Sequence, residues 1–141
     1  MSSCDQDNEE KCAYIPDVKP GSVNVEIESL EAVLPAIETK QDLVEFFSKL
    51  PQLRDDFFSR PGYPNDSAFI NMLYDRFTSP HIDTLLIETQ KVFGDLSELK
   101  EEFNLAFANI QFYYPNFRPP KIQTVISGLE TDLLVSDTLI V

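Results

Sequence analysis

The sequence predicts an α+β domain in which several short helices and one long helix precede a small antiparallel β-sheet or hairpin. Three observations lead to this prediction. Apolar residues recur at helical spacing through residues 39–114, and each run opens with a capping residue or a proline. After the proline pair at residues 119–120 the pattern changes to alternation, which is typical of strands. A chain of 141 residues is long enough for one domain and too short for two ordinary ones.

The first elements are short. Val23, Val25 and Ile27 alternate with polar residues, which indicates a strand over residues 23–27. A weak helical pattern follows over residues 29–37, and a proline within it limits its length.

Capping residues mark the starts of the next helices. Thr39 and Asp42 have the spacing of a capping box, with the hydroxyl first and the carboxylate three residues later. Pro51 suits the first turn of a further short helix. Asn65 or Asp66 can cap the helix that follows a turn-rich break.

Two longer helices come next. The pair at residues 79–80 is an N-cap serine followed by a first helical proline, and Gly94 is suited to end that helix. We expect its buried residues to be Ile82, Leu85, Leu86, Val92 and Phe93. Asp95 with Glu98 forms a second capping pair, and Pro115 ends the helix that it opens.

The longest helix is expected to supply the centre of the core. Its apolar residues recur at steps of three or four: Leu99, Phe103, Ala106, Phe107, Ile110 and Tyr114. The helices that carry Phe46, Phe57 and Phe69 are predicted to pack around it.

The last segment predicts the sheet. Residues 121–127 alternate, and the apolar runs 133–135 and 139–141 flank a polar turn at residues 136–138, which is a hairpin signal. The final strand has no predicted partner on its outer edge. We therefore expect an incomplete domain, the first part of a longer fold.

Charge restricts the classes of partner. Lys and Arg number 11 and Asp and Glu number 24, which gives a net charge of −13. Phosphate binding needs a basic surface, so nucleic acid is not an expected partner, and direct contact with anionic lipid is disfavoured. Hydrophobic residues make up 43 %, which indicates a folded chain, yet no apolar run is long enough to span a membrane.

The N-terminus suggests lipidation of Cys4. Residues 1–4 resemble the end of a lipobox, in which small residues precede a cysteine whose thiol is acylated. Residues 1–19 are mostly polar and contain Pro16, and Pro20 and Gly21 follow directly, as expected of a flexible tether. The alternative is a disordered tail that contains Cys4 by chance, and a disulfide between Cys4 and Cys12 would close a loop of little stabilising value.

Signals for catalysis are weak. His81 is the only histidine, no nucleophile can be paired with it, and surface or capping use is favoured. The acidic pairs lie on polar helix faces, so we expect solvated carboxylates rather than acid–base catalysts. We predict no catalytic residue, no metal site and no cofactor.

One aromatic segment is a candidate for partner binding. Tyr113, Tyr114, Phe117 and Arg118 surround the proline bend after the longest helix. Exposed aromatic side chains beside an arginine are common at interfaces. The alternative is a packed junction between helix and sheet.

Five stretches, taken in order, resemble the gliding-motility lipoprotein GldB family. They are FSKLPQL (47–53), FGDLSEL (93–99), YYPNF (113–117), TVISG (124–128) and VSDTL (135–139). The resemblance covers residues 20–141, and the lipobox-like start agrees with it. It is the ordered set, rather than any single stretch, that is specific.

The resemblance implies a membrane-anchored lipoprotein of the cell envelope, made with a signal peptide. It implies a supporting, non-catalytic role in gliding motility and in the associated type IX secretion system, whose envelope proteins would be its partners. Cys4 is the one functional position that it carries over. The alternative is a degenerate or truncated zinc-metallopeptidase-like enzyme whose ligand helix lies beyond this chain.

Overall fold

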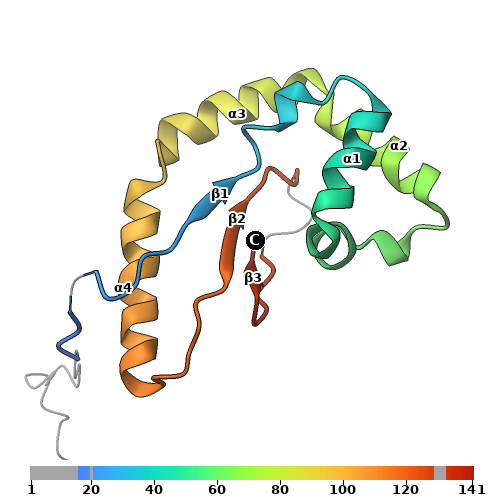
Figure 1. Ribbon diagram of the computed structural model, residues 1–141. Coiled ribbons are helices and arrows are strands. Elements are labelled where there is room, and N and C mark those ends of the chain that lie inside the picture. Colours follow the sequence, from blue (N-terminus) through green and yellow to red (C-terminus); the bar gives the residue numbers. More distant parts are fainter. Residues whose placement is uncertain (1–15, 20, 129–132) are drawn as a thin grey trace, which may run out of the picture.

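A computed structural model describes residues 16–19, 21–128 and 133–141 of the chain. Within these residues a three-stranded sheet has the order β1-β2-β3 (Figure 1). The strands are β1 (Ile27–Ser29), β2 (Lys121–Thr124) and β3 (Leu139–Ile140).

Helices form the rest of the fold. The long ones are α1 (Lys40–Lys49), α2 (Asp66–Phe77), α3 (Pro80–Phe93) and α4 (Ser97–Tyr113). Short helical turns are η1 (Leu34–Ala36), η2 (Leu53–Phe57) and η3 (Arg60–Gly62), of which η2 is a π-helix. In Figure 1, α1 and α2 gather at one end of the molecule, and α3 leads from them to α4, which runs alongside the sheet.

The sheet is parallel, so the predicted antiparallel sheet is wrong. Ile27 is in register with Ile122, and Lys121 is in register with Leu139, both in parallel pairs. The strand before the helices joins the sheet, and the helices form the crossover that returns the chain in the same direction. Alternation in the sequence indicates which residues are extended, but it does not identify their partner strand.

The predicted hairpin exists only as a local feature beside β3. Val135 and Ile140 form an isolated antiparallel bridge. The backbones of Leu134 and Val141 exchange hydrogen bonds of 3.1 and 3.0 Å. The outer edge of β3 is thus occupied, contrary to the expectation that the last strand lacks a partner.

Local capping signals fix the helix starts. Thr39 Oγ1 accepts a hydrogen bond from the Asp42 N–H at 3.2 Å, and Asp42 Oδ2 accepts one from the Thr39 N–H at 2.7 Å, so the predicted capping box is confirmed. Asn65 Oδ1 accepts from the Ala68 N–H at 2.8 Å and caps α2. Gly94 ends α3 with a φ of 57°.

The capping box predicted at Asp95 and Glu98 does not form. Leu96 is the N-cap residue of α4, with a φ of 63° and no capping hydrogen bond from its side chain. Asp95 Oδ1 instead accepts from the Ser97 N–H at 3.0 Å. A capping box needs its acceptor side chain at the N-cap position. The turn between α3 and α4 puts Leu96 at that position and Asp95 one residue before it, so the box cannot form.

Two clusters of buried apolar residues replace the single predicted core. The helical cluster takes most of its side chains from η1, α1, η2 and α2. Phe47 lies at its centre, and its ring is 5.2–5.4 Å from those of Phe46, Phe58 and Phe69. The sheet cluster joins α4 to the strands through Val23, Val25, Phe107, Ala108 and Ile122. The longest helix thus covers the sheet and is not the centre of a helical bundle.

The prediction of a buried apolar face on α3 is also wrong. Ile82 is buried, but Leu85, Val92 and Phe93 are exposed, Val92 by 73 %. In Figure 1, α3 bridges the two ends of the molecule. A helix that connects two clusters contacts each only near its ends, so its apolar periodicity does not produce a buried stripe.

Candidate interaction surface

Two surface regions of the described chain present apolar side chains beside polar backbone or charge. One is the predicted aromatic segment after α4, and the other is a groove beside β1. The predicted lipidation residue, Cys4, lies outside the described residues.

The aromatic segment separates into an exposed part and a packed part. Tyr113 and Tyr114 are 55 % and 70 % exposed, and Arg118 is exposed as well. Phe117 packs with its ring 5.5 Å from that of Phe107, which makes it a partner of the sheet cluster. Tyr113, Tyr114 and Arg118 therefore form the surface available to a partner.

The bend after α4 is held by hydrogen bonds. The Phe117 N–H donates to the Tyr114 carbonyl at 2.8 Å, and Gln111 Nε2 donates to the Phe117 carbonyl at 3.2 Å. Phe112, which was not among the predicted residues, packs edge-on against Tyr113 at 5.1 Å and is 48 % exposed. The exposed tyrosines thus stand on a fixed backbone.

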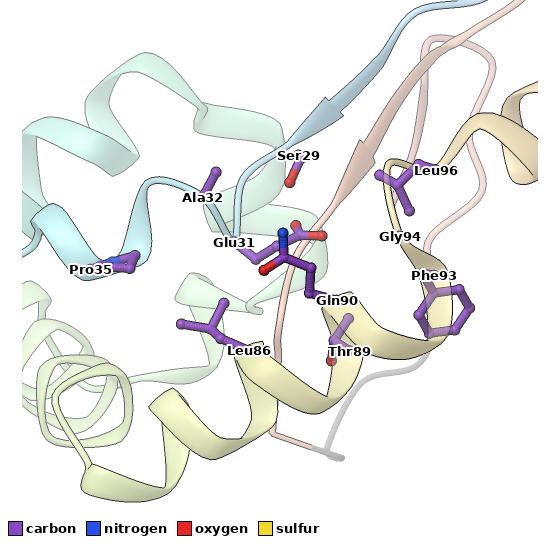
Figure 2. A pocket seen from close by; sticks show the side chains of 10 residues that line it. All are labelled: Ser29, Glu31, Ala32, Pro35, Leu86, Thr89, Gln90, Phe93, Gly94 and Leu96. Carbon is purple, nitrogen blue, oxygen red and sulfur yellow. The ribbon is translucent and has the colours of Figure 1, made fainter.

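A groove of about 280 Å³ lies between β1 and the residues that follow it on one side and α3 with the α3–α4 turn on the other. We call it the edge groove. Its lining includes Ser29, Glu31, Leu86, Gln90, Phe93 and Leu96. Figure 2 shows these side chains gathered around one hollow, with Glu31 and Gln90 next to each other.

The edge groove borders an unpaired strand edge. In a parallel pair, alternate residues direct both their N–H and their C=O to the neighbouring strand. The Leu30 N–H donates to the Thr124 carbonyl at 2.9 Å, so Glu28 and Leu30 face β2. Ile27 and Ser29 therefore face the opposite side, where no strand of the described chain pairs with β1.

Within the described part of the chain, Glu31 is the one charged residue that lines the edge groove. Its two carboxylate oxygens lie 2.9 and 2.8 Å from Thr124 Oγ1, which donates to it. Among the described residues no cation pairs with this carboxylate. A half-buried negative charge therefore remains available to a basic group.

Glu28 and Lys121 form an ion pair across β1 and β2. Lys121 Nζ lies 2.6 Å from Glu28 Oε2, and the buried Gln123 amide donates to the same oxygen at 2.6 Å. The hydrogen bond from Lys121, followed by that from Gln123, lowers the pKa of Glu28 below its usual 4.5. This pair links the two strands on the face opposite Ile27.

The structure places His81 and the acidic pair of Asp55 and Asp56 at the surface. His81 lies exposed in the first turn of α3. In the described parts of the chain, no three His, Cys, Asp or Glu side chains lie close enough to hold a metal ion. Asp55, in the acidic pair with Asp56, accepts from Arg54 Nε at 2.6 Å on the surface.

Sequence reasoning missed the edge groove because its apolar residues were assigned to the core. Leu86 and Phe93 belong to the periodic pattern of α3, which predicted burial. No local pattern in the sequence separates these two residues from core residues.

A family model described as gliding motility protein GldB, and labelled as a lipoprotein family, matches residues 11–141. No curated protein and no solved structure shows significant similarity to the chain. Cys4 lies before the matched residues. None of the described helices is both long and apolar enough to span a bilayer.

Proposed function

Because the chain belongs to the family of the gliding motility protein GldB, we propose that it is a lipid-anchored protein of the cell envelope. In this proposal it supports gliding motility and the associated type IX secretion machinery by binding other proteins. The family match over residues 11–141 is the observation that carries the proposal.

The anchor is proposed at Cys4. Two serines precede Cys4, and a polar segment with several acidic residues separates it from the residues that the structure describes. Acyl chains on Cys4 would hold the domain at a membrane surface, while the net charge of −13 would keep it from lying flat on anionic lipid.

Surface composition supports a binding role. Tyr113, Tyr114 and Arg118 are residue types that are enriched at interfaces, and all three are exposed. The alternative of a metallopeptidase-like enzyme has no supporting observation among the described residues.

Metabolic labelling with a fatty acid tests the anchor. We expect the full-length protein and Cys12→Ser to be labelled and to sediment with membranes, whereas Cys4→Ser is unlabelled and released. Cys12→Ser is the matched control because it removes the other thiol of the chain. Label on Cys4→Ser, or on none of the three proteins, would contradict lipidation at Cys4.

Complementation tests the role in motility. In a gliding bacterium that lacks its own copy, the wild-type gene should restore spreading, and Cys4→Ser should restore less. The double variant Tyr114→Ala, Arg118→Ala should also restore less, while Val44→Ala, an exposed apolar control on α1, should restore spreading fully. Full restoration by the double variant would exclude the aromatic segment as the binding surface.

A further inference from the structure

We propose that the outer edge of β1 and the edge groove bind a short extended segment of a partner protein in which apolar and basic residues alternate. The segment would add a strand to the sheet beside β1. The proposal deepens the proposed function, because it rests on the binding role and identifies the surface and the chemistry of the partner.

Backbone geometry supplies the hydrogen bonds. Ile27 and Ser29 direct their N–H and C=O groups away from β2, as the Leu30–Thr124 bond requires. An extended segment can pair with both residues, as occurs when a peptide joins an exposed sheet edge. Toward the start of β1 this edge is already occupied, because Asn104 Oδ1 accepts a hydrogen bond from the Val25 N–H at 2.8 Å. The available edge is therefore short, and so is the segment.

Alternate side chains of such a segment would meet two different surfaces. On the side of Ser29 lies the edge groove, where Leu86, Phe93 and Leu96 surround a volume of about 280 Å³ (Figure 2). Phe93 is 57 % exposed and would be covered by an apolar side chain placed there. Burial of this apolar surface would favour an aliphatic residue at these positions.

The opposite face is acidic and selects basic side chains. Glu26 and Glu28 project from that face, where Glu28 also pairs with Lys121. Lysine or arginine at alternate positions of the segment would lie next to these two carboxylates. On the groove side, Glu31 has no cationic partner among the described residues and adds to the negative charge around the segment.

Charge also argues against a second copy of the chain as the occupant. Two copies paired edge to edge would place Glu26 and Glu28 of one beside those of the other. Like charges in facing positions destabilise strand pairing, and each copy carries a net charge of −13. A basic segment of a partner protein is complementary in charge to this edge, whereas a second copy of the chain carries the same charge.

The test uses the purified chain and a synthetic heptapeptide, Lys-Val-Lys-Leu-Lys-Val-Lys, acetylated and amidated at its ends. Binding is measured by isothermal titration calorimetry, and amide hydrogen exchange is followed by NMR. In the free protein the Ile27 and Ser29 amides should exchange faster than those of Glu28 and Leu30. The peptide should slow exchange at Ile27 and Ser29. Control peptides with glutamate in place of lysine, or serine in place of valine and leucine, should bind at least about tenfold more weakly.

Variants locate the site. Ser29→Pro removes the backbone N–H of residue 29, which points away from β2, and keeps the backbone groups that pair with β2. Phe93→Ser removes part of the apolar lining of the edge groove and leaves the sheet unchanged. Each should weaken peptide binding about tenfold or more. Val92→Ser is the matched control on α3, because Val92 is exposed but does not line the groove, and it should bind like the wild type. Glu26→Gln, on the face that meets the basic side chains, should weaken binding and reduce its dependence on salt.

Three results would overturn the proposal. One is protection of the Ile27 and Ser29 amides in the free protein at all concentrations. Another is concentration-dependent protection without peptide, which would assign the edge to self-association. The third is peptide binding that leaves these amides unprotected or is unaffected by Phe93→Ser. Fatty-acid labelling of Cys4 is a separate measurement, so failure of the anchor and failure of this site are distinguishable.

Discussion

Asn104 Oδ1 accepts a hydrogen bond from the Val25 N–H at 2.8 Å, which ties α4 to the backbone of the extended segment that leads into β1. Val25 is buried, and its N–H points away from β2, where no strand of the described chain can accept a hydrogen bond from it. The Asn104 side chain supplies the acceptor that this N–H needs. One amide side chain of α4 thus covers the edge at Val25, whereas the outward N–H groups of Ile27 and Ser29 have no hydrogen-bond partner among the described residues.

Asn104→Ala should lower the free energy of unfolding by about 1–3 kcal/mol, because it leaves the Val25 N–H buried and unpaired. Urea denaturation measures this loss. Asn109→Ala is the control on the same helix: the side-chain oxygen of Asn109 is buried with no hydrogen-bond partner among the described residues, so its removal should cost less. Equal effects of the two substitutions would contradict the role assigned to Asn104.

Signals that act within a few residues allowed the helices to be predicted. The side chains of Thr39, Asp42 and Asn65 accept hydrogen bonds from free backbone N–H groups at the starts of their helices, and Gly94 lets the backbone turn at the end of α3. These effects act within one helix and do not depend on distant parts of the chain. The alternation of Val23, Val25 and Ile27 predicted a strand over residues 23–27. The strand β1 is instead Ile27–Ser29, and Val23 and Val25 lie just before it in the sheet cluster.

Asn65→Ala should lower the free energy of unfolding by about 1 kcal/mol, since it removes the acceptor for the Ala68 N–H at the start of α2. Thermal unfolding checks this value. Asn71 is exposed within the same helix, and Asn71→Ala should be neutral or slightly stabilising because alanine has the higher helix propensity. A melting temperature that falls equally for both variants would show that the cap does not contribute.

The strand pairing and the second cluster could not be predicted from local pattern. Ile27 and Ile122 are partners in register although the whole set of helices separates them in the sequence. Apolar periodicity in α3 and α4 predicted burial, but burial depends on what each helix meets. Leu86 and Phe93 therefore line the edge groove, the part of the candidate site that sequence reasoning did not identify.

Stability should decrease in acid partly through Glu28. Its pKa is lowered in the folded state, mainly by the hydrogen bond from Lys121, so its stabilising contribution is present above pH 4.5 and is lost as the pH falls through the lower folded value. Because Glu28 is partly exposed, the contribution should be about 0.5 kcal/mol or less. Urea denaturation at pH 7 and pH 3 should show a smaller difference for Glu28→Gln than for the wild type. Glu26→Gln, two residues earlier in the sequence, leaves the pair of Glu28 and Lys121 intact and should keep the wild-type difference.

Phe107 and Tyr114 belong to one predicted stripe, and the structure separates them. Phe107 is buried, with its ring 5.5 Å from those of Phe103 and Phe117, whereas Tyr114 is 70 % exposed. Phe107→Ala should therefore lower the free energy of unfolding by about 3–5 kcal/mol, and Tyr114→Ala by less than about 0.5 kcal/mol. Chemical denaturation of both variants measures the difference. A mild Phe107→Ala would mean that α4 does not hold the sheet, and a costly Tyr114→Ala would remove Tyr114 from the surface available to partners.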